Sequence, residues 1–372
     1  MVRGWVTRAA MKILYLNYEF PPLGGGGSPV SYEIARGYAR RGHTVDVVTM
    51  GFRDLPSREE VEGISIFRVP CIRARKEICH PWEQLSYLAS ARSFLTERLR
   101  NIRYDICHTH FIIPTGVLAL WVKKRFGLAY VLTAHGSDVL GYNRRFALIY
   151  PFIGRPWKAI VRGARYVTAP SDFLIQRMRE IIDLKTYVTV PNGIDLSRFR
   201  PMKKRPSILV VARLFQNKGV QDVLRALSGI NLKRWSVDIV GDGPYRQPLV
   251  ELCGRLGLED SVRFHGWIDN DSLAMKELYG RASVYVSASY FESFGMTVLE
   301  SLSAGCYPVL SDIGGHRFIV DDDRCFFPPG DIEALRMRLQ EAIDRGAKES
   351  RIDISRFTWD RIVDSYCGLL EG

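Results

Sequence analysis

Two glutamates flank a glycine in the stretch Glu292-Ser-Phe-Gly-Met-Thr-Val-Leu-Glu300, between a strand-like run and a helical pattern. Gly295 permits a tight turn there, and the first helical turn leaves backbone N–H groups free to bind an anion. Two carboxylates around such a site suit a ligand with hydroxyls at both ends and phosphate in the middle. A nucleotide sugar is such a ligand. An acidic helix start followed by a solvated Glu is the alternative.

Two cations follow another strand-like run, in Val211-Ala-Arg213-Leu-Phe-Gln-Asn-Lys218. Fixed cations at that place can neutralise a departing diphosphate, although solvated loop cations give the same pattern. His135 closes a further strand in Thr133-Ala-His-Gly-Ser-Asp138. A histidine at the carboxyl end of a strand is expected to point toward a ligand site. A hydrogen-bonded structural histidine is the alternative there.

Four consecutive glycines, Gly24 to Gly27, follow the first strand-like run. Glycines before a helix let backbone N–H groups approach a phosphate. The dinucleotide-binding fingerprint fails, because Pro29 or Val30 stands where its third glycine is required, and the second strand lacks the ribose-binding acid. A plain flexible turn is the alternative.

Strand-like and helical runs alternate along the whole chain, which predicts parallel sheets covered by helices. The predicted strands are Lys12–Asn17, Thr44–Thr49, Ser65–Val69, Asp105–Thr109, Tyr130–Thr133, Tyr166–Ala169, Tyr187–Val190, Ser207–Val211, Ser236–Val240, Val262–His265, Val284–Val286 and Tyr307–Leu310. The fold class expected is α/β, with two facing Rossmann-like doubly wound domains. Ligands of such sheets bind at the carboxyl ends of the strands, so the site is expected in the interdomain cleft.

The predicted domains are separated by a charged linker, Pro201-Met-Lys-Lys-Arg-Pro206. Residues 1–10 are expected to be an N-terminal extension, residues 11–200 an acceptor-side domain, and residues 201–372 a donor domain. The final helix, near residues 357–372, is compatible with either domain.

Charge is distributed unevenly between these halves. Residues 1–200 carry 30 Lys and Arg against 16 Asp and Glu, whereas residues 201–372 carry 22 against 24. A basic half suits an anionic membrane surface or a phosphorylated substrate, and no nucleic-acid-binding signature accompanies it. The segment Arg144 to Arg165, which mixes aromatics with cations, is the expected contact with lipid or a partner, and a solvated helix packed on its own sheet is the alternative.

The seven cysteines are scattered, which favours a reduced cytoplasmic protein over a disulfide scaffold or a zinc site. The longest apolar stretch, Phe111 to Val122, is too short to span a membrane. The expected location is cytoplasmic, with peripheral association at the inner face of a membrane. Asp269-Asn-Asp271 and Asp321-Asp-Asp323 have a spacing that binds metal in other transferases, but both lie in loop-like sequence, and we expect no metal.

Together these features resemble glycosyltransferase family 4, retaining enzymes of the two-Rossmann GT-B fold. The resemblance covers nearly the whole chain from Met11. The features that carry it are Glu292 and Glu300 with Ser293-Phe-Gly between, Arg213 with Lys218, Gly241-Asp-Gly-Pro244, and Pro191-Asn-Gly-Ile-Asp195.

The resemblance implies roles for individual residues. Glu292 and the amides of Phe294, Gly295 and Met296 would hold the donor sugar, Thr297 would touch phosphate, and Glu300 would bind the ribose diol. Ile268 and Asp269 would line the base site, and Gly26 would approach the phosphate. The implied catalytic residues are His135, Arg213, Lys218 and Glu292. The implied donor-binding residues are Gly26, Arg213, Lys218, Ile268, Asp269, Glu292, Ser293, Phe294, Gly295, Met296, Thr297 and Glu300. The implied acceptor-side residues are Tyr18, Gly25 and Gly27.

The expected function is transfer of a hexosyl group from a nucleoside-diphosphate sugar to a hydroxyl of a glycan or lipid-linked acceptor. Configuration would be retained, with no cofactor or metal and no nucleic-acid partner. Two alternatives remain from the sequence: a sugar-nucleotide 2-epimerase, which would turn over donor without acceptor, and a non-catalytic nucleotide-sugar binder. The base, the sugar, the acceptor and the oligomeric state do not follow from the residues.

Overall fold

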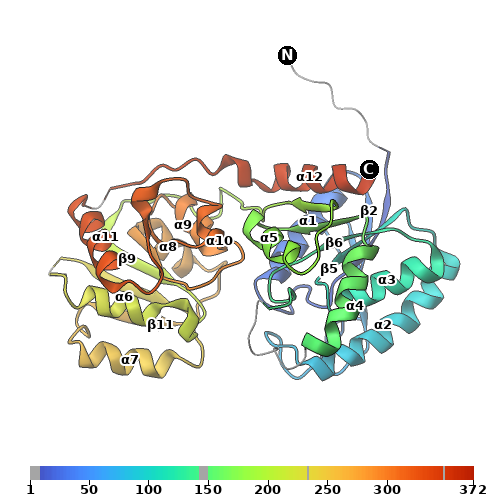
Figure 1. Cartoon of the computed structure of the whole chain (residues 1–372), viewed down its shortest axis with the longest axis horizontal. Helices are drawn as coiled ribbons and strands as arrows, with labels where there is room; N and C mark the ends of the chain where they lie inside the picture. Colours follow the sequence, from blue (N-terminus) through green and yellow to red (C-terminus); the bar gives the residue numbers. More distant parts are fainter. Residues whose placement is uncertain (1–8, 142–149, 233, 347) are drawn as a thin grey trace, which may run out of the picture. The chain divides into compact units, whose positions relative to one another are not determined.

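The computed structural model describes residues 9–141, 150–232, 234–346 and 348–372, which form two compact units (Figure 1). The first unit contains the chain up to Gly193 together with Trp359–Gly372, and the second contains Ile194–Thr358. Each unit has one sheet whose strands are joined by helices. The predicted α/β class with two Rossmann-like, doubly wound domains is confirmed.

The sheet of the first unit has the strand order β3-β4-β2-β1-β5-β6-β7-β8. Neighbouring strands are parallel except for β3 and β4, which are antiparallel. The strands are β1 (Lys12–Leu16), β2 (Thr44–Met50), β3 (Arg58–Val61), β4 (Ile64–Val69), β5 (Ile106–His110), β6 (Tyr130–Thr133), β7 (Tyr166–Ala169) and β8 (Tyr187–Thr189).

Helices cover both faces of this sheet. A large apolar core lies between the sheet and α2 (Pro81–Asn101), α3 (Thr115–Phe126), α4 (Tyr150–Gly163) and α5 (Asp172–Arg179). The chain turns back from β1 to β2 through α1 (Gly27–Arg40), so right-handed crossovers place α1 on the opposite face. The glycine-rich segment thus leads directly into α1, whose start lies at the carboxyl end of β1.

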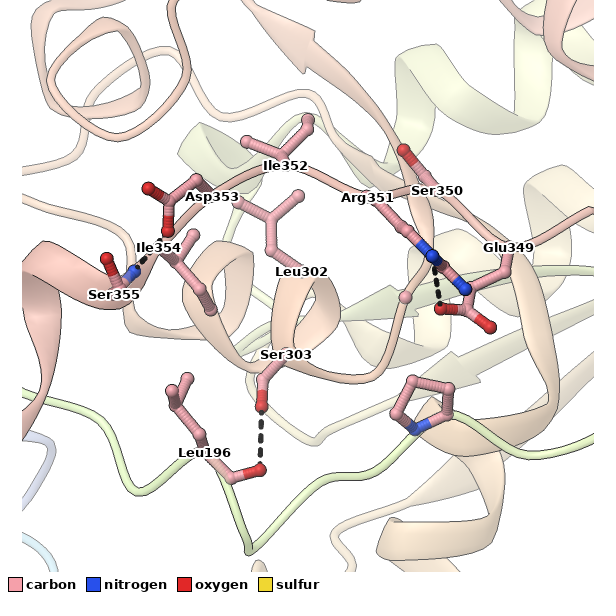
Figure 2. Close-up of a pocket in the computed structure, with 12 residues that line it drawn as sticks. Leu196, Leu302, Ser303, Glu349, Ser350, Arg351, Ile352, Asp353, Ile354 and Ser355 are labelled. Atoms are coloured by element: carbon pink, nitrogen blue, oxygen red, sulfur yellow. Dashed lines mark hydrogen bonds and ion pairs between the residues drawn. The ribbon is translucent and has the colours of Figure 1, made fainter.

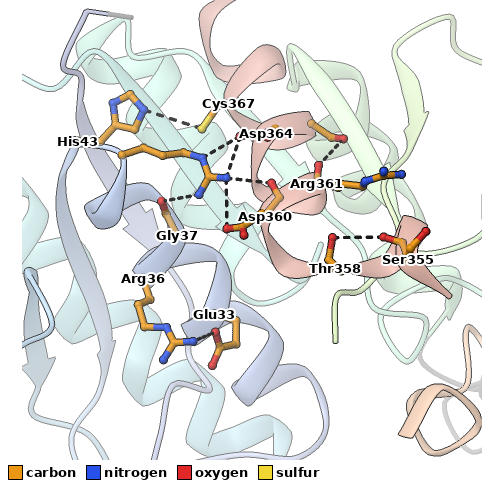
Figure 3. A network of polar contacts seen from close by, with 12 residues as sticks. Glu33, Arg36, Gly37, His43, Ser355, Thr358, Asp360, Arg361, Asp364 and Cys367 are labelled. Carbon is orange, nitrogen blue, oxygen red and sulfur yellow. Dashed lines mark hydrogen bonds and ion pairs between the residues drawn. The ribbon is translucent and has the colours of Figure 1, made fainter. Parts of the chain in front are cut away.

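The last helix, α12 (Trp359–Glu371), packs against α1 and completes that face of the first unit (Figure 3). Arg41 donates to the carboxylate of Asp364 at 2.8 Å and to the carbonyl of Asp360 at 2.9 Å. Val363 is buried against Gly37, where any side chain would clash with it. The buried Tyr366 hydroxyl lies 3.4 Å from the Thr133 hydroxyl at the end of β6.

The second unit has a fully parallel sheet with the order β11-β10-β9-β12-β13-β14. Its strands are β9 (Arg205–Val211), β10 (Ser236–Val240), β11 (Val262–Gly266), β12 (Ala282–Ser287), β13 (Tyr307–Ser311) and β14 (Phe326–Phe327). Its helices are α6 (Val220–Leu227), α7 (Arg246–Arg255), α8 (Leu273–Arg281), α9 (Met296–Ser303), α10 (Gly314–Arg317) and α11 (Ile332–Asp344). One core packs against α6, α7 and α11, and another against α8 and α9.

The segment expected as a charged linker is partly ordered structure. Arg205 and Pro206 belong to β9, and the Lys204 ammonium donates to the carbonyls of Ala282 and Ala304 at 2.8 and 2.6 Å. A cation at the last carbonyls of α9 is favourable for the helix dipole. The short strands β3 and β14 were not predicted. Over the part of the chain that is described, no helix has the length and apolar character needed to cross a bilayer.

Candidate functional site

Three neighbouring strands of the second unit deliver polar side chains to the carboxyl edge of its sheet. Lys218 lies in the short helix η2 (Gln216–Lys218) after β9, and Glu292 lies in the loop after β12. The Lys218 ammonium forms an ion pair with the Glu292 carboxylate, which also accepts a hydrogen bond from the Ser289 hydroxyl at 2.9 Å. The side chains of Lys218 and Glu292 are 16% and 23% exposed, so a ligand can still reach the pair.

Glu292 is held in its charged form. Burial by itself would raise the pKa of Glu292, but the charge of Lys218 and the hydrogen bonds from Lys218 and Ser289 outweigh burial and lower the pKa below its ordinary value. Gly315, after β13, lies so close to the Glu292 carbonyl that no side chain fits there. Lys218 and Ser289 therefore hold the carboxylate, and the close approach of Gly315 confines the backbone of Glu292.

The N-terminus of α9 forms the centre of this edge. Gly295 precedes the helix with a φ of +114°, a conformation that favours glycine. The Phe294 ring is buried in the core, so only the backbone of this residue is available to a ligand. The Thr297 hydroxyl accepts a hydrogen bond from Tyr285 at 2.7 Å and keeps its own hydrogen to donate. Together with the free amides of the first turn, this arrangement suits a phosphate.

Arg213 is exposed on the segment between β9 and η2. Its guanidinium lies 5.6 Å from the centroid of the Phe215 ring, a cation–π contact. Across the described ranges, no acid forms an ion pair with Arg213. This cation differs from Lys218 in that it does not have to leave a carboxylate in order to meet a phosphate.

Glu300 is buried one helical turn further along α9, with 6% of its surface exposed. Its two oxygens accept hydrogen bonds from the Asn270 amide at 3.0 Å and from the Tyr279 hydroxyl at 2.8 Å. Burial raises the pKa of Glu300, and these two bonds oppose the rise. Because a carboxylate has about four acceptor positions, Glu300 can also accept from the hydroxyls of a ligand.

The segment after β11 contains Ile268, which is half-buried against the core, and the exposed Asp269. The Asp269 carboxylate accepts from the amide of Asp271 at 2.8 Å, and Asp271 pairs with Arg198 at 2.9 Å. In the other Asp-x-Asp segment, Asp323 pairs with Arg317. These carboxylates are therefore engaged within the protein. No cluster of three or more His, Cys, Asp or Glu that would suit a metal ion occurs within the described ranges.

Several polar residues of this edge escaped the sequence-based prediction. His316 is buried at the start of α10, bonded through Nδ1 to the Ser311 carbonyl at 2.9 Å, and its ring lies against Gly295. Its position after a strand, in Gly314-Gly-His316, is the same signal that identified His135. Asn270 stands between the two aspartates considered for metal, and nothing local indicates its bond to Glu300. Ser293 is half-buried in the loop before α9.

In the first unit, His135 ends a chain of buried hydrogen bonds that fixes its tautomer. The Tyr15 hydroxyl donates to the Ser31 carbonyl at 2.8 Å, so its oxygen accepts from Nε2 of His110. Nδ1 of His110 must then accept from Nε2 of His135, 2.9 Å away. The remaining nitrogen of His135, Nδ1, is an acceptor and faces Gly27 at the start of α1. His135 thus offers a lone pair, suited to accept a hydrogen bond from a hydroxyl.

The backbone around His135 is held by one carboxylate. Asp138 accepts from the amides of His135 and Gly136, both at 2.9 Å, and from the amide of Ile112 at 2.8 Å. These bonds fix the turn after β6 against the turn after β5. The His135 ring also packs on Phe111, with ring centroids 4.5 Å apart.

The glycine-rich segment lies at the same edge. Gly24 has a φ of +103° and contacts Glu19, whereas Gly25 and Gly26 face open space. Tyr18 is largely buried, with its ring edge-on to Phe111 at 5.0 Å between centroids. The structure therefore brings Tyr18, the glycines and His135 to one edge of the first sheet. Of the segment Arg144–Arg165, residues 144–149 lie outside the described residues.

We expect acidification from pH 7 to pH 5 to destabilise the first unit. Burial lowers the pKa of His108 to about 3 and of His135 to about 4, against about 6.5 in an unfolded chain. Between these values the unfolded state binds more protons, so the free energy of unfolding falls as the pH falls. The expected loss in the free energy of unfolding is about 2 kcal/mol per histidine by pH 5. Urea denaturation at pH 7 and at pH 5 would measure it. His108→Gln should reduce the pH dependence, and equal stability at both pH values would contradict the expectation.

An open surface pocket of the second unit lies away from the residues described above (Figure 2). Leu302 and Ser303 at the end of α9 form one side, and the extended chain Glu349–Ser355 forms the other. Arg351 and Glu349 are paired at its rim at 3.4 Å. None of the predicted site residues lines it.

Comparison with known protein families gives two matches that together span residues 24–356. A family model described as Glycosyltransferase Family 4 matches residues 24–198, and one described as Glycosyl transferases group 1 matches residues 195–356. An uncharacterized glycosyltransferase of Methanocaldococcus jannaschii is 29% identical over 342 residues, which cover 83% of each chain.

Solved structures with the same fold include two with full-length similarity. Sucrose-phosphate synthase of Thermosynechococcus elongatus has a TM-score of 0.84 at 20% identity, covering 97% of this chain and 98% of that one. HepE of Anabaena, in complex with UDP and glucose, has a TM-score of 0.76 at 18% identity, covering 97% and 100%. At these identities the likeness concerns the fold alone.

Proposed function

Because the chain belongs to the glycosyltransferases of the family 4 and group 1 type, we propose that it transfers a hexosyl group from a nucleoside-diphosphate sugar to an acceptor hydroxyl. The transfer retains the anomeric configuration and needs no metal. The observation that carries the proposal is the ion pair of Lys218 with Glu292 beside the N-terminus of α9. An anion site, a cation and a carboxylate held in place thus lie together at the carboxyl edge of the second unit's sheet.

The donor is recognised by the second unit in this proposal. The diphosphate lies at the free amides of α9, where the Thr297 hydroxyl donates to it. Glu300 accepts from the ribose hydroxyls, and the backbone at Ile268 and Asp269 meets the base. Glu292, with the amides of Phe294, Gly295 and Met296, holds the sugar hydroxyls. A structure with the same fold is recorded with UDP and glucose, which supports a donor of this class.

In this proposal the first unit supplies a hydrogen-bond acceptor for the donor sugar and the residues that serve the acceptor. His135, with its acceptor nitrogen fixed by His110, takes a hydrogen bond from a sugar hydroxyl near the anomeric carbon. Gly26 leaves room for a phosphate, and Tyr18, Gly25 and Gly27 serve the acceptor side. The acceptor is a glycan or a lipid-linked hydroxyl.

The reaction breaks the bond between the anomeric carbon and the phosphate oxygen. The acceptor oxygen forms its new bond on the same face, and its proton passes to the departing phosphate. Arg213 and Lys218 stabilise the charge that grows on the diphosphate, so catalysis rests on electrostatics and positioning. Double displacement through a carboxylate is the rival mechanism.

We expect activity to persist in EDTA and an α-linked donor to give an α-linked product. The arginine partners of the Asp-x-Asp carboxylates motivate the first expectation. Thermal-shift screening with UDP, GDP and ADP identifies the base, since ligand binding raises the melting temperature, and NMR of the product gives its configuration. Loss of activity that Mn²⁺ restores, or an inverted product, would contradict the proposal. Donor turnover without any acceptor would instead indicate an epimerase.

A further inference from the structure

Three helices of the first unit, α2, α3 and α4, form one outer layer over the sheet, with α3 packed against both others (Figure 1). Together they carry nine Lys and Arg but only two Glu. One of these acids, Glu83, is buried and accepts from the amides of Ala74 and His80 at 2.8 and 2.7 Å. Glu97 is the single exposed acid on the helices of this layer, which is therefore strongly basic.

A cluster of exposed cations lies at one end of this layer. Strands β4 to β7 are parallel where they pair, and each of the three helices returns the chain between such strands. The helix N-termini therefore lie at the carboxyl edge of the sheet and the C-termini at the other edge. Lys123, Lys124 and Arg125 are exposed at the C-terminal end of α3.

Large apolar side chains are exposed at the N-terminal ends. Trp82 and Leu85 in the first turns of α2 are 52% and 65% exposed, and Phe152 in the first turn of α4 is 80% exposed. Ile72, 60% exposed, is held beside α2 because its amide donates to the Ser86 hydroxyl at 2.9 Å. These side chains share the carboxyl edge with the glycine-rich segment.

The connection to the glycine-rich segment is direct. The amide of Gly24 donates to the carbonyl of Lys76 at 2.8 Å, within the loop that carries Ile72. The apolar end of the layer thus adjoins the residues assigned to the acceptor side, and the exposed side chains of Arg75 and Lys76 place cations beside it.

We propose that the outer layer of α2, α3 and α4 binds the surface of an anionic lipid bilayer. Trp82, Leu85, Phe152 and Ile72 enter the headgroup region, and the basic helix ends lie over lipid phosphates. Apolar and aromatic side chains beside cations are the combination that interfacial binding requires. A nucleic acid or an acidic glycan would use the cations but would gain little from an exposed Leu and Ile. The further inference that the acceptor is linked to lipid rests on the proposed transfer reaction, whereas binding to the bilayer does not.

Co-sedimentation with vesicles tests the binding without donor or acceptor, so its failure and failure of the transfer reaction are separate results. The full chain should bind phosphatidylglycerol vesicles more tightly than phosphatidylcholine vesicles, and less tightly as salt rises. Trp82→Ser with Leu85→Ser should weaken binding roughly tenfold. Met337→Ser, which alters a 63% exposed side chain in the second unit, is the matched control and should bind as the wild type does.

A second variant set tests the charge. Replacing Lys123, Lys124 and Arg125 by Glu should weaken binding to anionic vesicles by roughly tenfold or more. The control replaces three exposed cations of the second unit by Glu, namely Lys203, Arg255 and Arg263. Equal binding to both vesicle types, wild-type binding by the charge-reversal variant, or retention on heparin without vesicle binding would each overturn the proposal.

Discussion

Replacing Lys218 by Ala is expected to slow sugar transfer by roughly 10²–10³-fold, the usual cost of removing one fixed electrostatic donor. Negative charge grows on the diphosphate as the sugar bond breaks, so the cation stabilises the transition state more than the bound donor. The loss should therefore appear in kcat rather than in KM. Steady-state kinetics with the donor identified by thermal shift gives both constants.

The ion pair with Glu292 adds a second effect that has to be separated from the first. Without Lys218, Glu292 loses the charge that keeps its pKa low. Transfer by Lys218→Ala combined with Glu292→Gln should remain slow, because neutralising the carboxylate does not restore a cation to the phosphate. Recovery of the wild-type rate in that double variant would show that Lys218 serves only to compensate Glu292.

Variants of Arg213, and of an exposed arginine away from the site, complete the test of these cations. Arg213→Ala should be slowed to a similar extent, and Arg213→Lys should recover only partly, because an ammonium cannot reproduce the planar two-pronged contact. Arg255→Ala, on the exposed side of α7, is the control and should leave the rate unchanged. If a substitution raised KM and left kcat unchanged, the altered cation would bind the substrate and the transition state equally well. It would then not stabilise the leaving group.

Replacing Glu300 by Gln is expected to weaken nucleoside-diphosphate binding by roughly tenfold to a hundredfold, since each hydrogen bond to a charged group contributes about 1.5–3 kcal/mol. The amide can keep the bonds with Asn270 and Tyr279, because a tyrosine hydroxyl can accept as well as donate. The melting temperature without ligand should therefore stay near that of the wild type. Calorimetric titration with the diphosphate measures the loss.

The control for this substitution is Glu251→Gln, an exposed residue of α7. Its affinity for the diphosphate should match the wild type. If Glu300→Gln also binds with wild-type affinity, the ribose does not meet this carboxylate. A fall in melting temperature without ligand would instead mark Glu300 as a residue needed for stability.

Much of the fold could be predicted because its strands are short, parallel and buried. Such strands appear in the sequence as runs of Val, Ile, Leu and Thr, and Tyr130–Thr133 and Ser236–Val240 have the bounds expected from those runs. The exceptions have physical reasons. Strand β3, with the sequence Arg-Glu-Glu-Val, lies at an open edge and has no buried face to give it a pattern. Helix α1 begins at Gly27, the last residue of a glycine run that by composition resembles a loop.

The candidate site residues could be chosen from the sequence, but the side chains that they contact could not. Glu292 and Lys218 were each recognisable in their own loops, whereas their ion pair depends on β9 and β12 being neighbours in the sheet. The acceptor role of His135 required His110 and Tyr15, which are buried residues of other strands and resemble ordinary core positions in the sequence. The order of strands in the sheet and the tautomer of His135 depend on contacts between distant parts of the chain. Local sequence patterns therefore cannot predict them.

The placement of α12 has a consequence for synthesis of the protein. The residues that complete the first unit are made after the second unit, because Trp359–Gly372 follow the whole of the second unit along the chain. A nascent chain that has just passed Gly193 exposes the surface of α1 that Val363 and Tyr366 will cover, and leaves Thr133 without its contact to Tyr366. We therefore expect the second unit, although later in the sequence, to reach its native state first on the ribosome. Until α12 is made, the first unit would expose an apolar face. We therefore expect a chaperone to bind that face during translation.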